Sequence, residues 1–319
     1  MQHFTSLLFS VLLLGIFAPR LAAQQEAQFT QFMEHKLGYN PAFAGAVETG
    51  TFTAIYRQQW LGFDDAPSSQ LITFNTRLTG NGIGLGGQIS RSTLGLSEFY
   101  TAEADYAYRI NVGTGGTLGV GISTSVRLLR VDFTEAAPVQ TGDESIPAGI
   151  QSKYVPNFGA GLYYDSPRFY LGISAPRLVE NSIDLSEETT IISREARHMY
   201  AMAGIRVKAS DKLRVIPQVL LKYVKGAPFD ADANVTAWWD DSFYGGLSYR
   251  LGGSKSSGIG ESVSLLFGTN LGDNLRAGFS YDLTLSEIKD YQSGSVEVLL
   301  QYAIGGRSGG EAIVSPRDF

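Results

Sequence analysis

Strict alternation of apolar and polar residues limits the fold of this chain more than any other feature. From Leu275 to Leu283, every odd position carries an apolar side chain and every even position a polar or small one. Successive side chains of a β-strand point to opposite faces, so such a segment has one apolar and one polar face. Several segments of this kind, joined into a closed sheet, are typical of a transmembrane β-barrel.

The N-terminus predicts export. Residues 1–23 hold an apolar run from Leu7 to Ala18 and end on Leu21-Ala22-Ala23, which is typical of a secretory signal with a small-residue cleavage site. The segment before this run has no Lys or Arg, so an N-terminal anchor helix is the alternative, although the run is too short to span a bilayer. No later stretch has the ~18 apolar residues of a membrane helix, so the exported chain is a β-barrel or is soluble in the envelope.

Composition favours the barrel and excludes several other classes. The 319 residues include 37 Gly, 16 Tyr and 18 Phe, and the mean hydropathy of −0.02 fits strands with one apolar face. The net charge of −6 does not suggest nucleic-acid binding. The chain has no Cys and three His, so we expect neither a disulfide nor a lipid-modified N-terminal Cys, and no metal site or cofactor.

Alternation and turn residues together predict about fourteen strands. They cover residues 51–57, 69–78, 82–91, 98–110, 117–130, 154–164, 168–174, 197–208, 212–224, 233–239, 242–251, 261–269, 274–283 and 295–304. Charged residues share one parity within the strands and must face the lumen, because a charge facing lipid costs a few kcal/mol. Examples are Arg127, Arg206, Arg250, Arg276, Asp282 and Glu297.

The connections alternate between short turns and longer loops. Outer-membrane barrels have short periplasmic turns and longer outer loops, which predicts an even number of strands with both termini in the periplasm. We therefore expect an all-β, transmembrane, antiparallel up-and-down barrel of the outer membrane at residues 48–304, preceded by a signal peptide at 1–23 and followed by a tail at 305–319. Residues 24–47 lack alternation and form either a periplasmic contact segment or a plug in the lumen.

Aromatic residues beside carboxylates mark the first long loop as a candidate site. Trp60 and Phe63 precede Asp64-Asp65, a combination that suits a binding partner or a cation. The alternative is that both aromatic residues belong to an interfacial girdle, and the same interpretation is favoured for Trp238-Trp239.

Other patterns do not support catalysis or ligand binding. A hydrolase would need a nucleophile and a base, of which Ser193 and His198 are the best pair, but their spacing gives no support and a structural His198 is favoured. Acidic pairs such as Asp143-Glu144 lack a calcium-loop pattern. The glycine-rich residues 82–87 alternate like a strand and are not followed by the residues of a phosphate loop.

Two motifs near the N-terminus resemble the PorP/SprF family of the type IX secretion system. They are QFTQFM at residues 28–33 with YNPAFAG at 39–45, and YRQQWLGF at 56–63 with APSSQ at 66–70. Shorter similar segments follow in matching order: YAYRI at 106–110, PNFGAG at 156–161, YLGISAP at 170–176, GAP at 226–228, GLSYR at 246–250 and GFSYD at 278–282. The tail at residues 305–319 departs from the family, whose members often stop at the last strand.

This resemblance implies a non-enzymatic barrel in the Gram-negative outer membrane. Such a barrel would support export or surface attachment of sorting-domain cargo such as adhesins, including those of gliding motility. The implied partners are the lipid bilayer, periplasmic components of the type IX machinery and the secreted proteins themselves. The candidates for partner contact are Asn40, Pro41, Trp60, Gly62, Phe63 and Pro67.

Two other functions fit parts of the pattern. A general or substrate-selective porin would also have a charged lumen and a barrel of this size. A secreted β-sandwich binding module would also have short alternating strands, although it would stay in solution without detergent.

Overall fold

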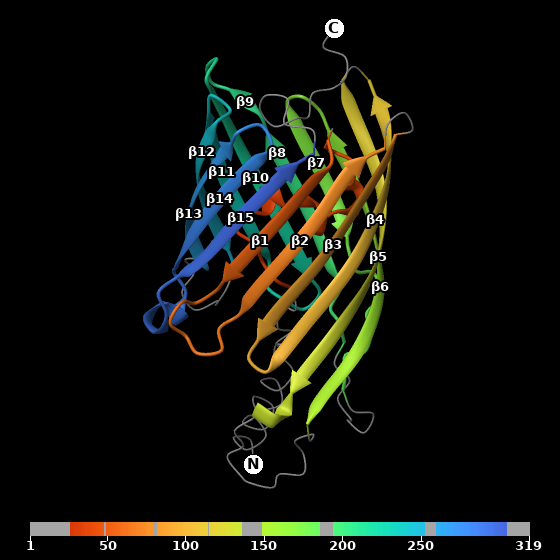
Figure 1. Cartoon of the computed structure of the whole chain (residues 1–319), viewed down its shortest axis with the longest axis vertical. Coiled ribbons are helices and arrows are strands. Elements are labelled where there is room, and N and C mark those ends of the chain that lie inside the picture. The colour runs from red at the N-terminus through yellow and green to blue at the C-terminus, as the bar shows by residue number, and fades with distance from the viewer. Residues whose placement is uncertain are drawn as a thin grey trace, which may run out of the picture.

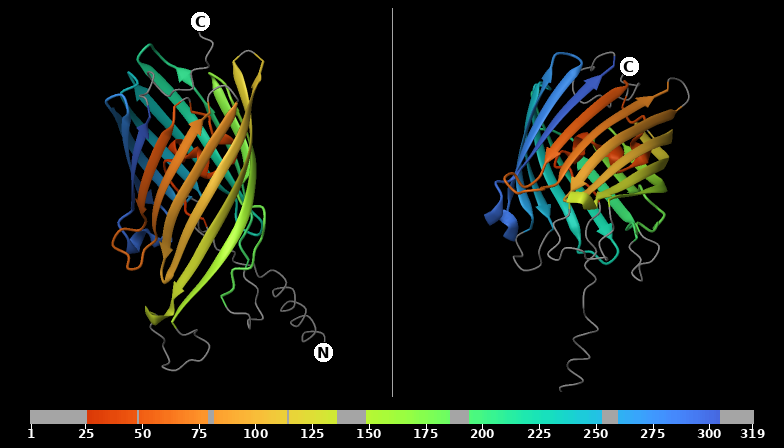
Figure 2. Two further views of the ribbon diagram at one scale, coloured as in Figure 1. Left: turned by 45° about the vertical axis from the view of Figure 1, so that its right-hand side comes forward. Right: turned by 60° about the horizontal axis from the view of Figure 1, so that its bottom comes forward.

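A computed structural model describes residues 26–47, 49–78, 82–113, 115–135, 149–185, 194–252 and 260–304. The predicted signal peptide at residues 1–23, the tail at 305–319, and the acidic pair Asp143-Glu144 lie outside this part of the chain. Figures 1 and 2 show the strands wrapping around a central space that holds the first described residues, drawn in red.

The strands form one closed antiparallel sheet. Fifteen strand segments are hydrogen-bonded in a ring, and β8 and β9 both pair with β10 on either side of Arg206, so the barrel has fourteen strands. The ring closes where β1 pairs with β15, with Thr51 opposite Ala303. The segments are β1 (Thr51–Gln58), β2 (Ser68–Arg77), β3 (Ile83–Leu94), β4 (Ser97–Val112), β5 (Gly116–Asp132), β6 (Ile150–Asp165), β7 (Phe169–Ala175), β8 (His198–Ile205), β9 (Val207–Lys208), β10 (Leu213–Val224), β11 (Asp230–Trp239), β12 (Phe243–Leu251), β13 (Ser262–Leu271), β14 (Leu275–Thr284) and β15 (Ser295–Ala303).

This closed sheet confirms the predicted antiparallel barrel and its strand number. We call the end with the short connections, such as residues 166–168 and 240–242, the turn end, and the opposite end the loop end. One connection departs from the expected rhythm, because β3 and β4 are joined at the loop end by Gly95-Leu96 alone. Gly95 has a φ of 53°, a left-handed conformation that favours glycine in such tight turns.

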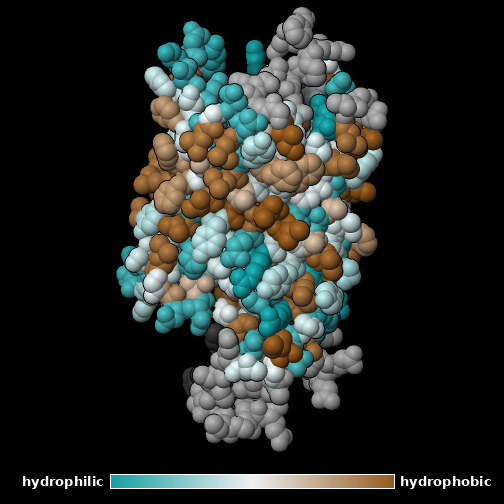
Figure 3. Space-filling view, in the orientation of Figure 1, coloured by the Kyte–Doolittle hydropathy of each residue, from teal (hydrophilic) through white to brown (hydrophobic). Residues whose placement is uncertain are grey.

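Side chains alternate across the wall as the sequence predicts. In β4, Glu103, Asp105 and Arg109 are buried inside, whereas Tyr106 and Tyr108 are exposed on the outer face. The outer face is apolar over much of the barrel wall (Figure 3). The six charged residues expected to face the lumen all do so, because each forms an ion pair inside the barrel.

One aromatic prediction was wrong. Trp239 is 47% exposed on the outer face, as a girdle residue would be, but Trp238 is 2% exposed and lies inside against Tyr244. Adjacent residues of a strand face opposite sides, so only one residue of the pair can contact lipid.

The helical elements are all short 3-10 turns. In the lumen lie η1 (Phe32–Glu34), η2 (Lys36–Gly38) and η3 (Pro41–Phe43), while η4 (Phe133–Glu135) and η5 (Glu287–Tyr291) belong to connections at the loop end. Within the described residues, no helix is long and apolar enough to cross a membrane. The main apolar core lies between the luminal segment and the wall, where Phe32, Met33 and Tyr39 pack against inward-facing aromatic and aliphatic residues of β6 to β13.

Candidate functional site

Residues 26–47 fill the lumen, and we call them the plug. Glu26 lies at the loop end, beside Arg177 of the connection between β7 and β8. Gly45 lies near the turn end, where its backbone N–H donates to Asn75 Oδ1 at 2.7 Å. The plug therefore runs from the loop end to the turn end, where β1 begins and β15 ends.

Ion pairs hold the start of the plug. The carboxylate of Glu26 contacts two guanidinium groups, with Oε1 2.7 Å from Arg127 Nη2 and a second contact to Arg177. Arg127 also pairs with Glu195 at 2.9 Å. Burial alone would raise the pKa of Glu26, but the two guanidinium groups outweigh it and lower this pKa to about 2. Glu26 is therefore a carboxylate at every physiological pH.

The next contact is made by the plug backbone. The N–H groups of Thr30 and Gln31 donate to the two carboxylate oxygens of Glu297, at 2.8 Å and 2.9 Å. The Thr30 hydroxyl donates to Asp282 at 2.8 Å, and Arg57 pairs with both acids, at 2.6 Å to Asp282 and 3.3 Å to Glu297. Because these groups are buried and paired, breaking one contact would leave an uncompensated charge.

Two cations fix the middle of the plug. Glu34 pairs with Arg276 at 2.9 Å, and the guanidinium of Arg276 lies 4.4 Å from the ring centre of Trp238. The ammonium of Lys36 lies 4.2 Å from the ring centre of Tyr170. Cations favour the faces of aromatic rings, and this preference strengthens when water is excluded.

Asn40 ties the plug to the barrel wall. Its Oδ1 accepts a hydrogen bond from Ala42 N at 2.9 Å and thereby caps η3. Its Nδ2 donates to the carbonyls of Leu162 at 2.9 Å and Ile173 at 3.3 Å, which lie opposite each other on β6 and β7. With no exposed surface, Asn40 makes all of its contacts inside the barrel.

Inward-facing glycines let the plug backbone touch the wall. A Cβ at Gly121 would lie 2.3 Å from Ala42 N, and one at Gly84 would lie 2.1 Å from Ala44 O. Real Cβ atoms do not approach backbone this closely, so these positions accept only glycine unless the plug moves. Within the glycine-rich residues 82–87, Gly84 of β3 makes room for Ala44 and Gly86 makes room for Leu37.

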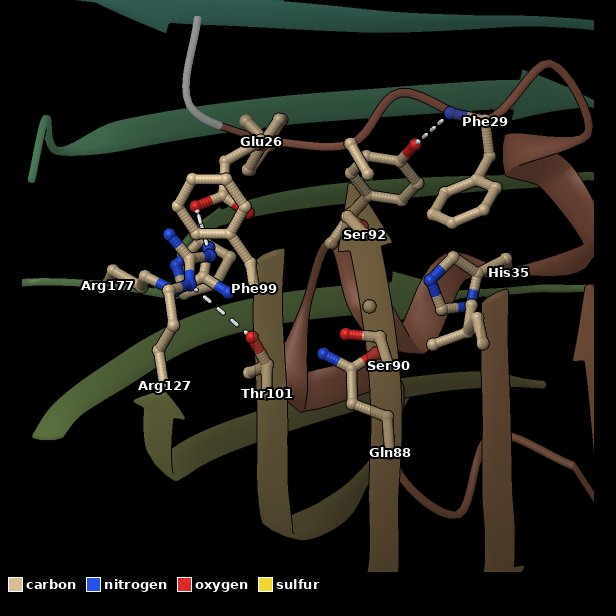
Figure 4. Close-up of a pocket in the computed structure, with 16 residues that line it drawn as sticks. Glu26, Phe29, His35, Gln88, Ser90, Ser92, Phe99, Thr101, Arg127 and Arg177 are labelled. Carbon is tan, nitrogen blue, oxygen red and sulfur yellow. Dashed lines mark hydrogen bonds and ion pairs between the residues drawn. The ribbon is translucent and has the colours of Figure 1, made fainter. Parts of the chain in front are cut away.

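A polar cavity of about 70 Å³ remains beside the start of the plug (Figure 4). It is lined on the plug side by Glu26, Phe29 and His35, by Arg177 of the connection between β7 and β8, and on the wall side by Gln88, Ser90, Ser92, Phe99, Thr101 and Arg127, among others. In Figure 4, Glu26 and the two guanidinium groups lie at one side of this space and His35 at the other.

The family model of the type IX secretion system membrane protein PorP/SprF matches residues 21–302. This chain belongs to the PorP/SprF family. The match covers the plug and every strand except the last residue of β15. This PorP/SprF protein is therefore an outer-membrane β-barrel, as its closed sheet and apolar outer face require.

Three solved structures are distantly similar to this PorP/SprF barrel. The outer membrane protein Omp33 of Acinetobacter baumannii is 7% identical, with a TM-score of 0.45, over 82% of this chain and 100% of that one. The toluene transporter TbuX of Ralstonia pickettii is 12% identical, with a TM-score of 0.49, over 83% and 92%. The KdgM porin in complex with oligogalacturonate is 10% identical, with a TM-score of 0.38, over 80% and 99%. No curated protein matches the chain in sequence.

The six predicted contact residues of this PorP/SprF protein fall into two separate places. Asn40 and Pro41 are buried in the plug, so an outside partner could reach them only if the plug moved. The other four, Trp60, Gly62, Phe63 and Pro67, lie in the connection between β1 and β2 at the loop end.

This loop has a defined shape. Trp60 and Phe63 pack edge to face, with 6.2 Å between ring centres, and Phe63 is 44% exposed. Leu61 N donates to Gly294 O at 2.8 Å, which joins this loop to the connection between β14 and β15. Gly62 has a φ of 85°, a conformation that accounts for glycine at this position. Contact of this loop with a partner stays a prediction.

His198 has structural contacts. Its Nδ1 lies 3.0 Å from Ala196 O, and its ring stacks on Tyr200. Ser193, the nucleophile considered with it, lies outside the described residues. Among the residues that the structure describes, no group of three or more acidic or His side chains is arranged to hold a metal ion.

The plug contacts were missed in the sequence. A sequence pattern that indicates these contacts was present. Glycines occupy inward-facing positions of neighbouring strands, and the plug carries the small residues Ala42 and Ala44. Alternation reports which face a residue takes, but not what lies opposite it.

Proposed function

We propose that this protein is a non-enzymatic component of the type IX secretion system that acts by protein contact. It supports export or surface attachment of sorting-domain proteins such as adhesins, including those of gliding motility. Its partners are periplasmic components of the machinery and the secreted proteins. The family match supports the secretion role, and the filled lumen is the structural observation that carries the contact mechanism.

The filled lumen favours this role over a porin. A porin needs a continuous aqueous path, whereas here the plug makes backbone contacts with the wall and its charged groups are paired. With the interior occupied, the surfaces left for a partner are the two ends of the barrel. The loop that carries Trp60 and Phe63 is joined to the connection between β14 and β15, and it offers the contact surface at the loop end.

Deletion of the gene tests the proposal. We expect loss of surface display of a cognate sorting-domain protein, measured by labelling whole cells with an impermeant reagent, while uptake of small solutes stays unchanged. Complementation with the unaltered chain should restore display. Normal display in the deletion strain, or a loss of solute uptake instead, would overturn the proposed role.

A further inference from the structure

Two parts of the plug are held in different ways. The inner part, residues 36–47, packs its backbone directly against wall glycines such as Gly84 and Gly121. The outer part, residues 26–35, is held by side chains of the wall, chiefly Arg127, Glu297 and Arg276. The inner part therefore combines this close backbone packing with hydrogen bonds such as that of Asn40 Nδ2 to Leu162 O. The outer part depends on ion pairs, hydrogen bonds and the buried side chains of Phe29 and Phe32.

The wall groups around the outer part recognise general features of a peptide. Glu297 accepts two successive backbone N–H groups, which any residues except Pro supply. Arg127 and Arg177 both contact the Glu26 carboxylate in addition to that of Glu195, and guanidinium groups bind carboxylates from any source. These contacts require an acidic residue four positions before the bonded backbone, and the packing of Phe29 against Ile55, Leu71 and Leu299 adds an apolar residue one position before it.

The plug leaves part of this site unfilled. The cavity of about 70 Å³ adjoins Glu26 and exceeds the ~10–15 Å³ that one water needs. Its wall carries the hydroxyl of Ser90 and that of Ser92, which is bonded to Ser69 Oγ at 3.2 Å, and Gln88 Oε1 is buried without a hydrogen-bond partner among the described residues. We call Arg127 and Arg177 the two-arginine clamp. Beside the Glu26 carboxylate that it binds, the clamp has free volume and further polar groups.

We propose that the wall around residues 26–31 is a binding site for an extended acidic peptide segment of a partner protein, reached from the loop end. The outer part of the plug is the resident occupant, with Glu26 in the position of the partner's carboxylate. The inner part remains in place and keeps the lumen sealed. This inference deepens the proposed function and rests on it, because it gives the chemical class of one partner segment.

Peptide binding tests the site in the purified full chain. The probe is a fluorescein-labelled peptide with the sequence of residues 24–34, and Glu26→Gln in the chain weakens the resident contact. We expect about tenfold tighter binding to this variant than to the unaltered chain, since a charge-assisted contact is lost by the competitor. A probe carrying Gln in place of the Glu that corresponds to Glu26 should bind about tenfold more weakly.

A matched variant separates the clamp from other effects. The chain with both Glu26→Gln and Arg177→Gln should lose the preference for the acidic probe. Equal binding of the acidic and neutral probes to the Glu26→Gln chain would overturn the proposal, and so would failure of the acidic probe to bind. Retention of the folded band on an unheated gel establishes that each variant is a barrel.

Thiol labelling reports which part of the plug moves. The chain has no Cys, so a single introduced Cys is a unique site for a bulky maleimide. The acidic probe should raise labelling of an Ala27→Cys chain and leave that of a Leu37→Cys chain low, since Leu37 packs against Gly86 in the inner part. No change at either position, or an increase at both, would overturn the proposal.

These measurements use purified protein, whereas the type IX role is tested by surface display in cells. If the peptide does not bind, but surface display still requires the protein, the proposed binding site is wrong and the type IX role stands. If the peptide binds, but surface display does not require the protein, the type IX role is wrong and the binding site stands.

Discussion

At the scale of single residues, position inside the barrel decides what each side chain can do. Asn40 is a polar residue in a recognisable motif and was a candidate for partner contact. Buried in the plug, it uses its amide to join η3 to β6 and β7. Its motif therefore has a structural explanation that does not require a partner.

Replacing Asn40 tests this explanation. Asn40→Ala removes three hydrogen bonds and leaves buried polar groups unpaired, so we expect a loss of roughly 2–5 kcal/mol in stability. The measurement is the temperature at which the folded band disappears on a gel. Asn181→Ala is the matched control, because its hydrogen bond to Pro156 O is exposed. Equal effects of the two changes would contradict the structural role.

Glu26 gives a prediction for pH. Its pKa falls from 4.5 to about 2 in the folded chain, because the pull of Arg127 and Arg177 exceeds the effect of burial. A lowered carboxyl pKa stabilises the fold above the unfolded value of 4.5, and this contribution is lost as the pH falls through about 2.

Labelling of an Ala27→Cys chain measures this dependence. After acid exposure for increasing times with an acid-stable thiol reagent, accessibility should stay low down to about pH 4.5 and rise as the pH approaches 2. Adding Glu26→Gln should raise accessibility at neutral pH and weaken the rise in acid. A steep rise between pH 7 and 5 in the unaltered background would show that another group controls the contact.

At the scale of elements, alternation specified the strands and their inner and outer faces. Glu103, Asp105 and Arg109 of β4 turn inward, and Tyr106 and Tyr108 turn outward, as predicted. The failures come from local geometry, because Trp238 takes the inner parity and the connection of β3 to β4 is a two-residue turn. The end of a strand depends on its pairing with the neighbouring strand, and the sequence of one segment does not contain this information.

Two glycines test the match between strands and plug. At Gly121 an added Cβ meets the plug backbone at 2.3 Å, so Gly121→Ala should cost about 1–3 kcal/mol and increase labelling of a Leu37→Cys chain. Gly245 on β12 has nothing within 4 Å of its added Cβ, and Gly245→Ala should change stability by less than about 0.5 kcal/mol. Similar behaviour of both variants would contradict the proposed contact between wall and plug.

At the scale of the whole molecule, the plug occupies the lumen and contacts the wall from the loop end to the turn end. We expect little steady current from the unaltered protein in a planar bilayer. Deleting residues 24–47 should give a lasting ohmic current, since the wall that remains is polar and charged. A large steady current through the unaltered protein would contradict a sealed lumen and would favour the porin alternative.

Alternation and turn residues along the chain were enough to predict the barrel, its strand number and the inner or outer face of most strand side chains, because strand side chains alternate with a period of two. The tertiary structure decided that residues 26–47 lie in the lumen, and that Glu26, Thr30 and Asn40 meet wall residues far away in sequence. The physical reason is that closing the sheet brings fourteen inward faces around one space, and the groups that meet there are set by register and packing between strands.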